Sequence, residues 1–166
     1  MDMSENELQQ DTIIVGEHEY SLALDIVIAQ AKQQLLIFDQ DFSIGDYSSI
    51  KRYERVHDFL SKDNTSRLTI ILHDTTHFTT QCPRLLNLLL TFGHKMTVYE
   101  TNDHAKIAKD CFVLADDTSY IRRFHIDQSR FKYMLNDKET TASLKNRFDE
   151  LLQETTHPVS ATKLGL

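Results

Sequence analysis

The segment from His73 to His77 contains two histidines with an aspartate between them, and these side chains could bind a divalent metal ion. Neutral imidazole suits zinc or iron, carboxylate suits magnesium, and Asp39 or Asp41 could complete the coordination shell. The helical metal signature His-Glu-x-x-His needs a glutamate, which this segment lacks. Two interpretations stay open: a metal site at His73, Asp74 and His77, or a turn in which Asp74 accepts hydrogen bonds from backbone N–H groups.

Two arginines are candidates for binding an anionic group. Arg84 follows Cys82-Pro83 at the expected start of a helix, and Arg122 lies beside Arg123 in an expected strand. Neighbouring strand residues point to opposite faces, so one of this pair could reach the functional edge of the sheet. A planar guanidinium group binds phosphate or carboxylate with two parallel hydrogen bonds. Arg84 and Arg122 would form an anion site if they converge; the alternative is surface salt bridges with the many acids.

Cys82 stands at the same expected helix start, where unpaired backbone N–H groups lower the pKa of a thiol. A tyrosine-phosphatase loop has Cys, five residues and then Arg, but Leu88 occupies that last position here. We therefore expect Cys82 to be a small buried residue rather than a nucleophile.

The elements that must position these side chains follow from two alternating hydrophobic patterns. Short apolar runs predict strands at 13–15, 35–38, 68–72, 96–99, 111–115, 120–124 and 131–135. Helical spacing predicts helices at about 20–32, 48–61, 83–92 and 141–152, the last capped by Thr140 or Thr141. Continuous apolar runs are typical of strands buried on both faces. The alternation predicts an α/β fold with a mixed, mostly parallel sheet sandwiched by helices.

Polar side chains gather where the first buried strands end. Right-handed crossovers bring these ends to one edge of the sheet, the edge where open α/β sheets bind ligands. The acids and the histidine at this edge are Asp39, Asp41, His73, Asp74 and Glu100. We predict a ligand pocket there, in which Arg84 and Arg122 hold an anion and His73 and Asp74, with Asp39, orient it.

The composition is that of an ordinary globular protein, with 40% hydrophobic and 26% charged residues among 166. We expect one domain at 13–156 between flexible tails at 1–12 and 157–166. The net charge of -7 argues against broad binding to nucleic acid or anionic membranes. An acidic N-terminus and the lack of a long apolar run predict a cytoplasmic protein. Because no Gly-rich phosphate loop is present, we expect no cofactor.

Three segments resemble a small bacterial domain of the phospholipase D-like class: ALDIVIAQAKQQLLIFDQDF, RLTIILHDTTHFTTQCPRLLNLL and DCFVLADDTSYIRR. The resemblance covers roughly 20–155 and implies a fold like one half of a phospholipase D. Active half-size members of that superfamily pair two copies, so the resemblance also implies a homodimer. Such domains sometimes accompany acetyltransferases of the GNAT type, which makes an acetyltransferase a candidate protein partner.

The catalytic motif of that superfamily is His, one residue, Lys, four residues and Asp. His104 and Lys106 match its start, but the acid comes one place early at Asp110, and Cys111 occupies the required place. In that superfamily the His is the nucleophile and a second His the general acid, while the Lys stabilises the charge of the transferring phosphoryl group.

A second register places the motif on the apolar run 111–115. Asp116 then matches the motif's Asp, but Cys111 stands in place of its Lys and Lys109 in place of its His. This register implies a non-catalytic phospholipase D-like domain that binds a protein partner or a small anionic ligand. The alternative is a phosphodiesterase or nuclease that uses His104 and Lys106, or a metal at His73, Asp74 and His77.

Overall fold

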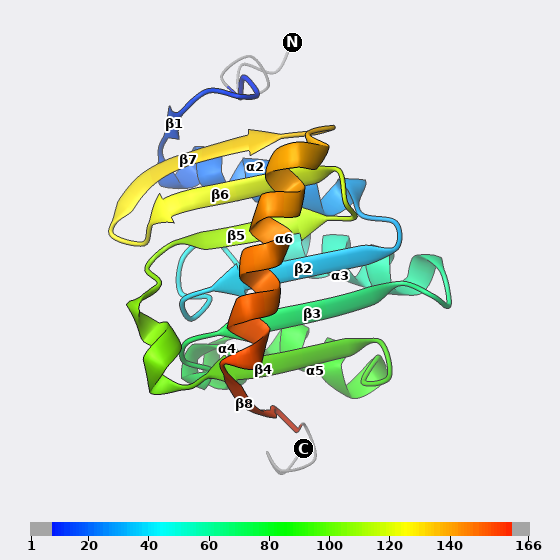
Figure 1. Ribbon diagram of the computed structural model, residues 1–166. Coiled ribbons are helices and arrows are strands. Elements are labelled where there is room, and N and C mark those ends of the chain that lie inside the picture. Colours follow the sequence, from blue (N-terminus) through cyan, green and yellow to red (C-terminus); the bar gives the residue numbers. More distant parts are fainter. Residues whose placement is uncertain (1–7, 161–166) are drawn as a thin grey trace.

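Helices cover both faces of a single mixed β-sheet in the computed structural model, which describes residues 8–160 (Figure 1). The strands are β1 (Ile14–Val15), β2 (Gln34–Asp39), β3 (Arg67–Leu72), β4 (Met96–Thr101), β5 (Cys111–Ala115), β6 (Ser119–His125), β7 (Gln128–Met134) and β8 (Thr155–Pro158). The helices are α2 (Glu17–Gln30), α3 (Ile50–Lys62), α4 (Thr76–Gln81), α5 (Pro83–Thr91), the 3₁₀ helix η1 (Asp103–Ile107) and α6 (Lys138–Gln153).

The strand order across the sheet is β1-β7-β6-β5-β2-β3-β4-β8. The predicted α/β class with a mixed sheet between helices is confirmed, but the prediction that most strands are parallel is wrong. Within the described residues, two of the seven strand pairings are parallel, β2 with β3 and β3 with β4. The reason is the short connection through η1, which starts β5 at the edge where β4 ends, so β5 runs back antiparallel to β2. Short turns then join β5, β6 and β7, and such turns connect antiparallel strands.

The sheet separates two hydrophobic cores. On β2, Leu35 and Ile37 belong to the core beneath α2, α3, α4 and α5, whereas Leu36 and Phe38 belong to the core beneath α6. This alternation also decides the face on which each polar residue at a strand end lies. Among the described residues, no helix combines the length and apolar character that a membrane crossing needs.

The ends of the described chain pack on the domain. Residues 1–7 and 161–166 of the two predicted tails lie outside the described residues. The described part of the predicted N-terminal tail, 8–12, is not loose, because Leu8 is buried and its carbonyl accepts a hydrogen bond from the Tyr133 hydroxyl. At the other end, β8 pairs with β4 as far as Pro158, beyond the predicted domain end at 156.

Asp116, which matches the acid of the phospholipase D motif, has a structural role here. Its carboxylate accepts hydrogen bonds from the backbone N–H groups of Lys32, Gln33 and Gln34, at 3.1, 2.8 and 3.0 Å. Its own N–H donates to the Gln34 carbonyl at 2.8 Å, and its φ of 55° lies in the left-handed region that Asp tolerates better than most residues. Asp116 therefore fastens the start of β2 to the end of β5.

We expect Asp116→Ala to lower the free energy of unfolding by about 1 to 2 kcal/mol, because three N–H groups lose their acceptor and alanine tolerates the positive φ poorly. Urea denaturation measures the change. Asp117→Ala is the matched control, since Asp117 is exposed in the same turn. Equal stability of the two variants would contradict this role for Asp116.

Candidate functional site

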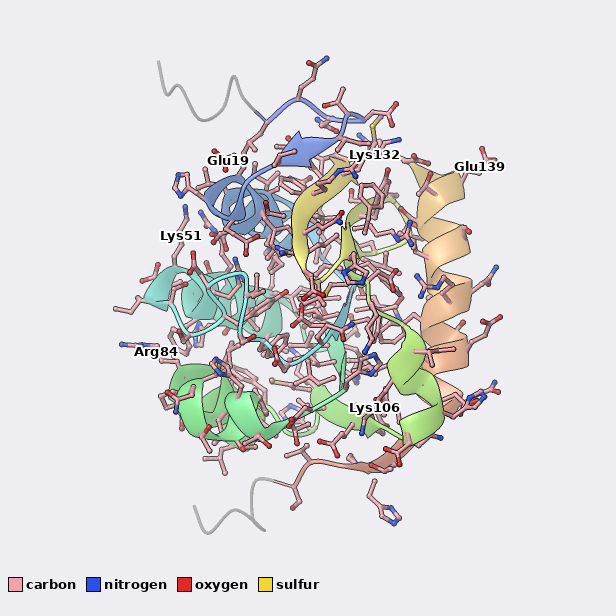
Figure 2. The ribbon with its side chains drawn as sticks, turned by 90° about the vertical axis from the view of Figure 1, so that its left-hand side faces the viewer. Glu19, Lys51, Arg84, Lys106, Lys132 and Glu139 are labelled. Atoms are coloured by element: carbon pink, nitrogen blue, oxygen red, sulfur yellow. The ribbon has the colours of Figure 1, made fainter. Side chains whose placement is uncertain are left out.

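A pocket of about 480 Å³ lies at the edge where the parallel strands β2, β3 and β4 end. Ligands of open α/β sheets usually bind at this edge. We call this cavity the strand-end pocket. Its lining residues are Gln40, His73, Asp74, Thr76, Glu100, Lys106 and Lys109. Figure 2 shows the molecule from this edge, with Lys106 on η1. Of the predicted ligand residues, His73 and Asp74 line this pocket.

His73 is held by hydrogen bonds from both sides of its ring. Its Nε2 lies 2.7 Å from the Ala108 carbonyl oxygen and its Nδ1 lies 2.7 Å from the Thr101 hydroxyl. Because a carbonyl can only accept, Nε2 carries the proton and Nδ1 accepts from Thr101. Burial lowers the pKa of His73, which favours this neutral form. His73 therefore shapes the pocket, and both of its ring nitrogens are engaged in hydrogen bonds.

Gln40 and His73 together fix the segment that carries the two lysines. The side-chain amide of Gln40 donates to the carbonyls of Ala108 and Asp110, each at 3.0 Å. With the His73 bond to Ala108, these contacts fix the backbone on both sides of Lys109. The backbone that carries Lys109 is therefore held in place at the pocket before any ligand binds.

The two acids of the strand-end pocket are oriented by the start of α4. Asp74 Oδ1 accepts the Thr76 N–H at 2.8 Å, and this bond contributes most to lowering the pKa of Asp74. Glu100 Oε1 accepts the N–H and the hydroxyl of Thr75, at 2.9 and 3.0 Å. The turn interpretation of Asp74 is confirmed.

The metal interpretation of His73, Asp74 and His77 is not supported by the geometry. Both His73 nitrogens are occupied, and His77 lines a different cavity beside the loop at 42–48. Across residues 8–160, no group of three or more His, Cys, Asp or Glu side chains could hold a metal ion. The two histidines lie in different surroundings, because His73 directly follows the end of β3 whereas His77 lies in α4.

Asp39 lies on the other side of the sheet from His73. It shares the face of Leu35 and Ile37, and it is buried. Its Oδ2 accepts the backbone N–H groups of Phe42 and Asp41, at 2.7 and 3.2 Å. Burial raises the pKa of Asp39 to about 6. Asp39 therefore supports the loop after β2 and does not line the strand-end pocket.

The predicted convergence of Arg84 and Arg122 does not occur. Arg84 is exposed on α5, where its Nη1 donates to the Ser48 carbonyl at 3.3 Å. Figure 2 shows Arg84 in the helical layer away from η1. Arg122 points to the α6 face, where its Nε donates to Asp110 Oδ2 at 3.0 Å. The sheet separates the two guanidinium groups, so they cannot hold one anion.

Arg147 on α6, a residue that sequence reasoning missed, completes a cluster with Arg122 and Asp110. Its Nη2 donates to Asp110 Oδ1 at 2.9 Å, and its Nη1 also contacts that carboxylate. Burial alone would raise the pKa of Asp110, but the hydrogen bonds and charges of both arginines outweigh it and hold the pKa below its ordinary value. The sequence feature that could have revealed Arg147 is its helical spacing, which places it on the same side of α6 as the buried residues Leu144 and Leu151.

The residues that match the phospholipase D motif in its two alignments lie in different surroundings. The His104 side chain on η1 is 82% exposed, with Nδ1 3.5 Å from Glu154 Oε2. Cys111 is buried on β5, and burial raises the pKa of its thiol well above the usual value. Cys82 is buried as predicted, and burial raises its pKa to about 11. Neither thiol is available as a thiolate nucleophile at neutral pH.

Residues 17–161 match the model of the family described as Domain of unknown function (DUF7931). No curated protein matches the chain. Among solved structures, the fold is similar to Nuc, a phospholipase D family member from Salmonella typhimurium, with a TM-score of 0.62 and 11% identity over 87% of this chain and 96% of Nuc. It is also similar to NucT from Helicobacter pylori, with a TM-score of 0.61 and 15% identity over the same shares of the two chains. A third similar structure is TrmBL2, an archaeal chromatin protein, with a TM-score of 0.66 and 10% identity over 89% of this chain, which spans only 53% of TrmBL2.

Proposed function

Since the chain belongs to the family described as Domain of unknown function (DUF7931) and has a phospholipase D-like fold, we propose that it is a non-hydrolytic phospholipase D-like domain that binds a small anionic ligand. The observation that carries this proposal lies at the start of β5 and in the residues just before it. A buried, protonated thiol, Cys111, stands in place of the motif's Lys, and Lys109 stands in place of its His. A phosphohistidine intermediate needs an imidazole nucleophile, which this strand does not supply.

The lining of the strand-end pocket supports the proposal that the ligand is an anion. Lys106 and Lys109 enter it from one connecting segment, and Gln40 and His73 fix the backbone of that segment. Lys109 forms no ion pair within residues 8–160, so its ammonium group can interact with a ligand. A fixed backbone reduces the entropy that is lost when a ligand orders the site.

The phosphodiesterase alternative requires His104 to be held rigidly as a nucleophile, and its exposed position does not favour this. The imidazole projects into solvent from a 3₁₀ helix and lies beside Glu154. A nucleophile needs a rigid element and close packing to hold it at the reacting atom. Lys106 reaches the strand-end pocket, but His104 does not line it.

We expect no hydrolysis of bis-p-nitrophenyl phosphate above the buffer rate, with EDTA or with added Mg²⁺, Mn²⁺ or Zn²⁺. The His104→Ala variant should behave like the wild type in release of p-nitrophenolate. Turnover that His104→Ala abolishes would overturn the non-hydrolytic proposal. Turnover that only EDTA abolishes would replace it with a metal-dependent activity.

We expect Lys109→Ala to weaken the binding of propylphosphonate about tenfold, because one charge-assisted contact is worth about 1.4 kcal/mol. Isothermal titration calorimetry at low salt measures the dissociation constant. Lys138→Ala is the matched control, because Lys138 is exposed at the start of α6 and does not line the pocket. Equal affinities of the two variants for propylphosphonate would show that Lys109 does not bind the anion.

A further inference from the structure

We propose that the strand-end pocket selects a zwitterionic ligand, with its anionic group at Lys106 and Lys109 and its cationic group at Asp74 and Glu100. This inference rests on the proposed function, because it adds a second charged group to the anion that the lysines bind. It is carried by the arrangement of the four charged side chains around one cavity.

The charges of opposite sign come from different parts of the chain. Asp74 follows β3 and Glu100 lies in β4, whereas Lys106 lies on η1 and Lys109 in the connection to β5. Within the described chain, no ion pair joins either acid to either lysine. Among residues 8–160, the one ion pair that these four side chains form is Lys106 with Asp103, at 3.3 Å on the surface. An exposed pair of this kind contributes about 1 kcal/mol or less, so a ligand can displace it.

The acids keep their negative charge toward the pocket. Each is oriented through one oxygen, Oδ1 of Asp74 and Oε1 of Glu100, by neutral donors of Thr75 and Thr76. Neutral hydrogen-bond donors orient a carboxylate without cancelling its charge. Glu100 Oε2 accepts no hydrogen bond from the described residues, so it can accept one from an ammonium group, and the Asp74 carboxylate adds a second negative charge to the same cavity.

A ligand with a single charge fits this lining poorly. A ligand with only a negative charge is attracted by the lysines but repelled by the two carboxylates that line the same cavity. A ligand with only a positive charge is attracted by the carboxylates but repelled by the lysines. A molecule with both charges can place each opposite its complement. The pocket volume of about 480 Å³ lies in the range of small-molecule sites, roughly 300 to 1,000 Å³.

The test compares two phosphonates of nearly equal size, 2-aminoethylphosphonate and propylphosphonate, which differ in an ammonium group for a methyl group. Neither can be hydrolysed as a phosphate ester, so the measurement reports binding alone. By titration calorimetry at pH 7 and low salt, we expect 2-aminoethylphosphonate to bind about tenfold more tightly, because the ammonium group gains one charge-assisted contact.

Variants of the acids assign that preference to the pocket. Glu100→Gln keeps an oxygen for Thr75 but removes the charge, so we expect the ratio of the two affinities to fall to about threefold or less. Propylphosphonate should bind this variant at least as well as it binds the wild type. Glu139→Gln is the matched control, because Glu139 is exposed at the start of α6, far from Lys106 (Figure 2). A ratio that Glu100→Gln and Asp74→Asn both leave unchanged would overturn the assignment.

The remaining outcomes separate this inference from the proposed function. Equal binding of the two phosphonates would overturn the preference for a zwitterion and leave the anion site intact. If neither phosphonate nor inorganic phosphate binds, the proposed anion site fails as well, and the zwitterion with it.

Discussion

Asp110→Ala is expected to lower the free energy of unfolding at pH 7 by about 3 kcal/mol, because it removes one partner of a largely buried ion cluster. The Asp110 carboxylate is buried and receives hydrogen bonds from Arg122 Nε at 3.0 Å and from Arg147 Nη2 at 2.9 Å. Without it, two guanidinium groups with like charge face each other between β6 and α6. The side chains of Arg122 and Arg147 are 37% and 36% exposed, so hydration of the guanidinium groups offsets part of the lost stability.

The effect of Asp110→Ala should shrink in acid. The two arginines hold the pKa of Asp110 below its ordinary value of 3.8, although burial opposes them. A carboxyl whose pKa is lower in the folded state contributes stability above the unfolded pKa and loses it as the pH falls through the folded pKa. Below about pH 4, the wild type should therefore approach the variant in stability.

Urea denaturation at pH 7 and at pH 3 measures both effects. Asp149→Ala is the control, because Asp149 pairs with Lys145 on the exposed side of α6 and such pairs contribute about 0.5 kcal/mol. A cost of Asp110→Ala as small as that of Asp149→Ala would show that the cluster adds nothing to stability.

Apolar periodicity was enough to predict the central sheet. The runs at 35–38, 68–72 and 96–99 became β2, β3 and β4, and their parallel order brings His73, Asp74 and Glu100 to one edge. This follows because continuous apolar runs between amphipathic helices have few other ways to bury both faces.

The face on which each polar residue lies could not be predicted. A strand that is apolar at every position gives no sign of which residues point to α2 and which to α6. Asp39 and His73 both follow buried strands, yet Asp39 lies on the face of Ile37 and His73 lies on the face of Ile71. The same ambiguity hid the partner of Arg122, because its contact with Asp110 depends on the register of β5 against β6.

Short polar elements were also beyond sequence reasoning. The helix α4, the 3₁₀ helix η1 and the edge strand β8 have no apolar period long enough to detect, and tertiary contacts position them. The cap of α6 was placed at Thr140 or Thr141, which is wrong: Asp137 accepts the Thr140 N–H at 2.9 Å. Since η1 leads to Lys109, the lysine side of the strand-end pocket depended on an element that the sequence pattern does not reveal.

Asp39→Asn is expected to raise the free energy of unfolding at pH 7 by about 2 kcal/mol, the opposite direction to Asp110→Ala. Burial raises the pKa of Asp39 from 3.8 to about 6, and a shift of that size corresponds to about 3 kcal/mol at neutral pH. No basic side chain of residues 8–160 forms an ion pair with it, and its neighbours include Tyr20, Tyr47 and Cys111. Asparagine can still accept the Phe42 N–H, but its amide meets the sulfur of Cys111, a weak acceptor, which reduces the gain.

The pH dependence distinguishes this account from a simple packing effect. A carboxyl with a raised folded pKa adds stability below the unfolded pKa and loses it as the pH rises through the folded pKa. The wild type should therefore become more stable from pH 7 to about pH 4.5, and Asp39→Asn should lack that rise. Asp39→Ala is the control: it removes the charge but also the acceptor for Phe42, so it should be less stable than Asp39→Asn. An Asp39→Asn variant less stable than the wild type at pH 7 would show that the loop after β2 needs the ionised carboxylate, which would make Asp39 a stabilising charge rather than a buried cost.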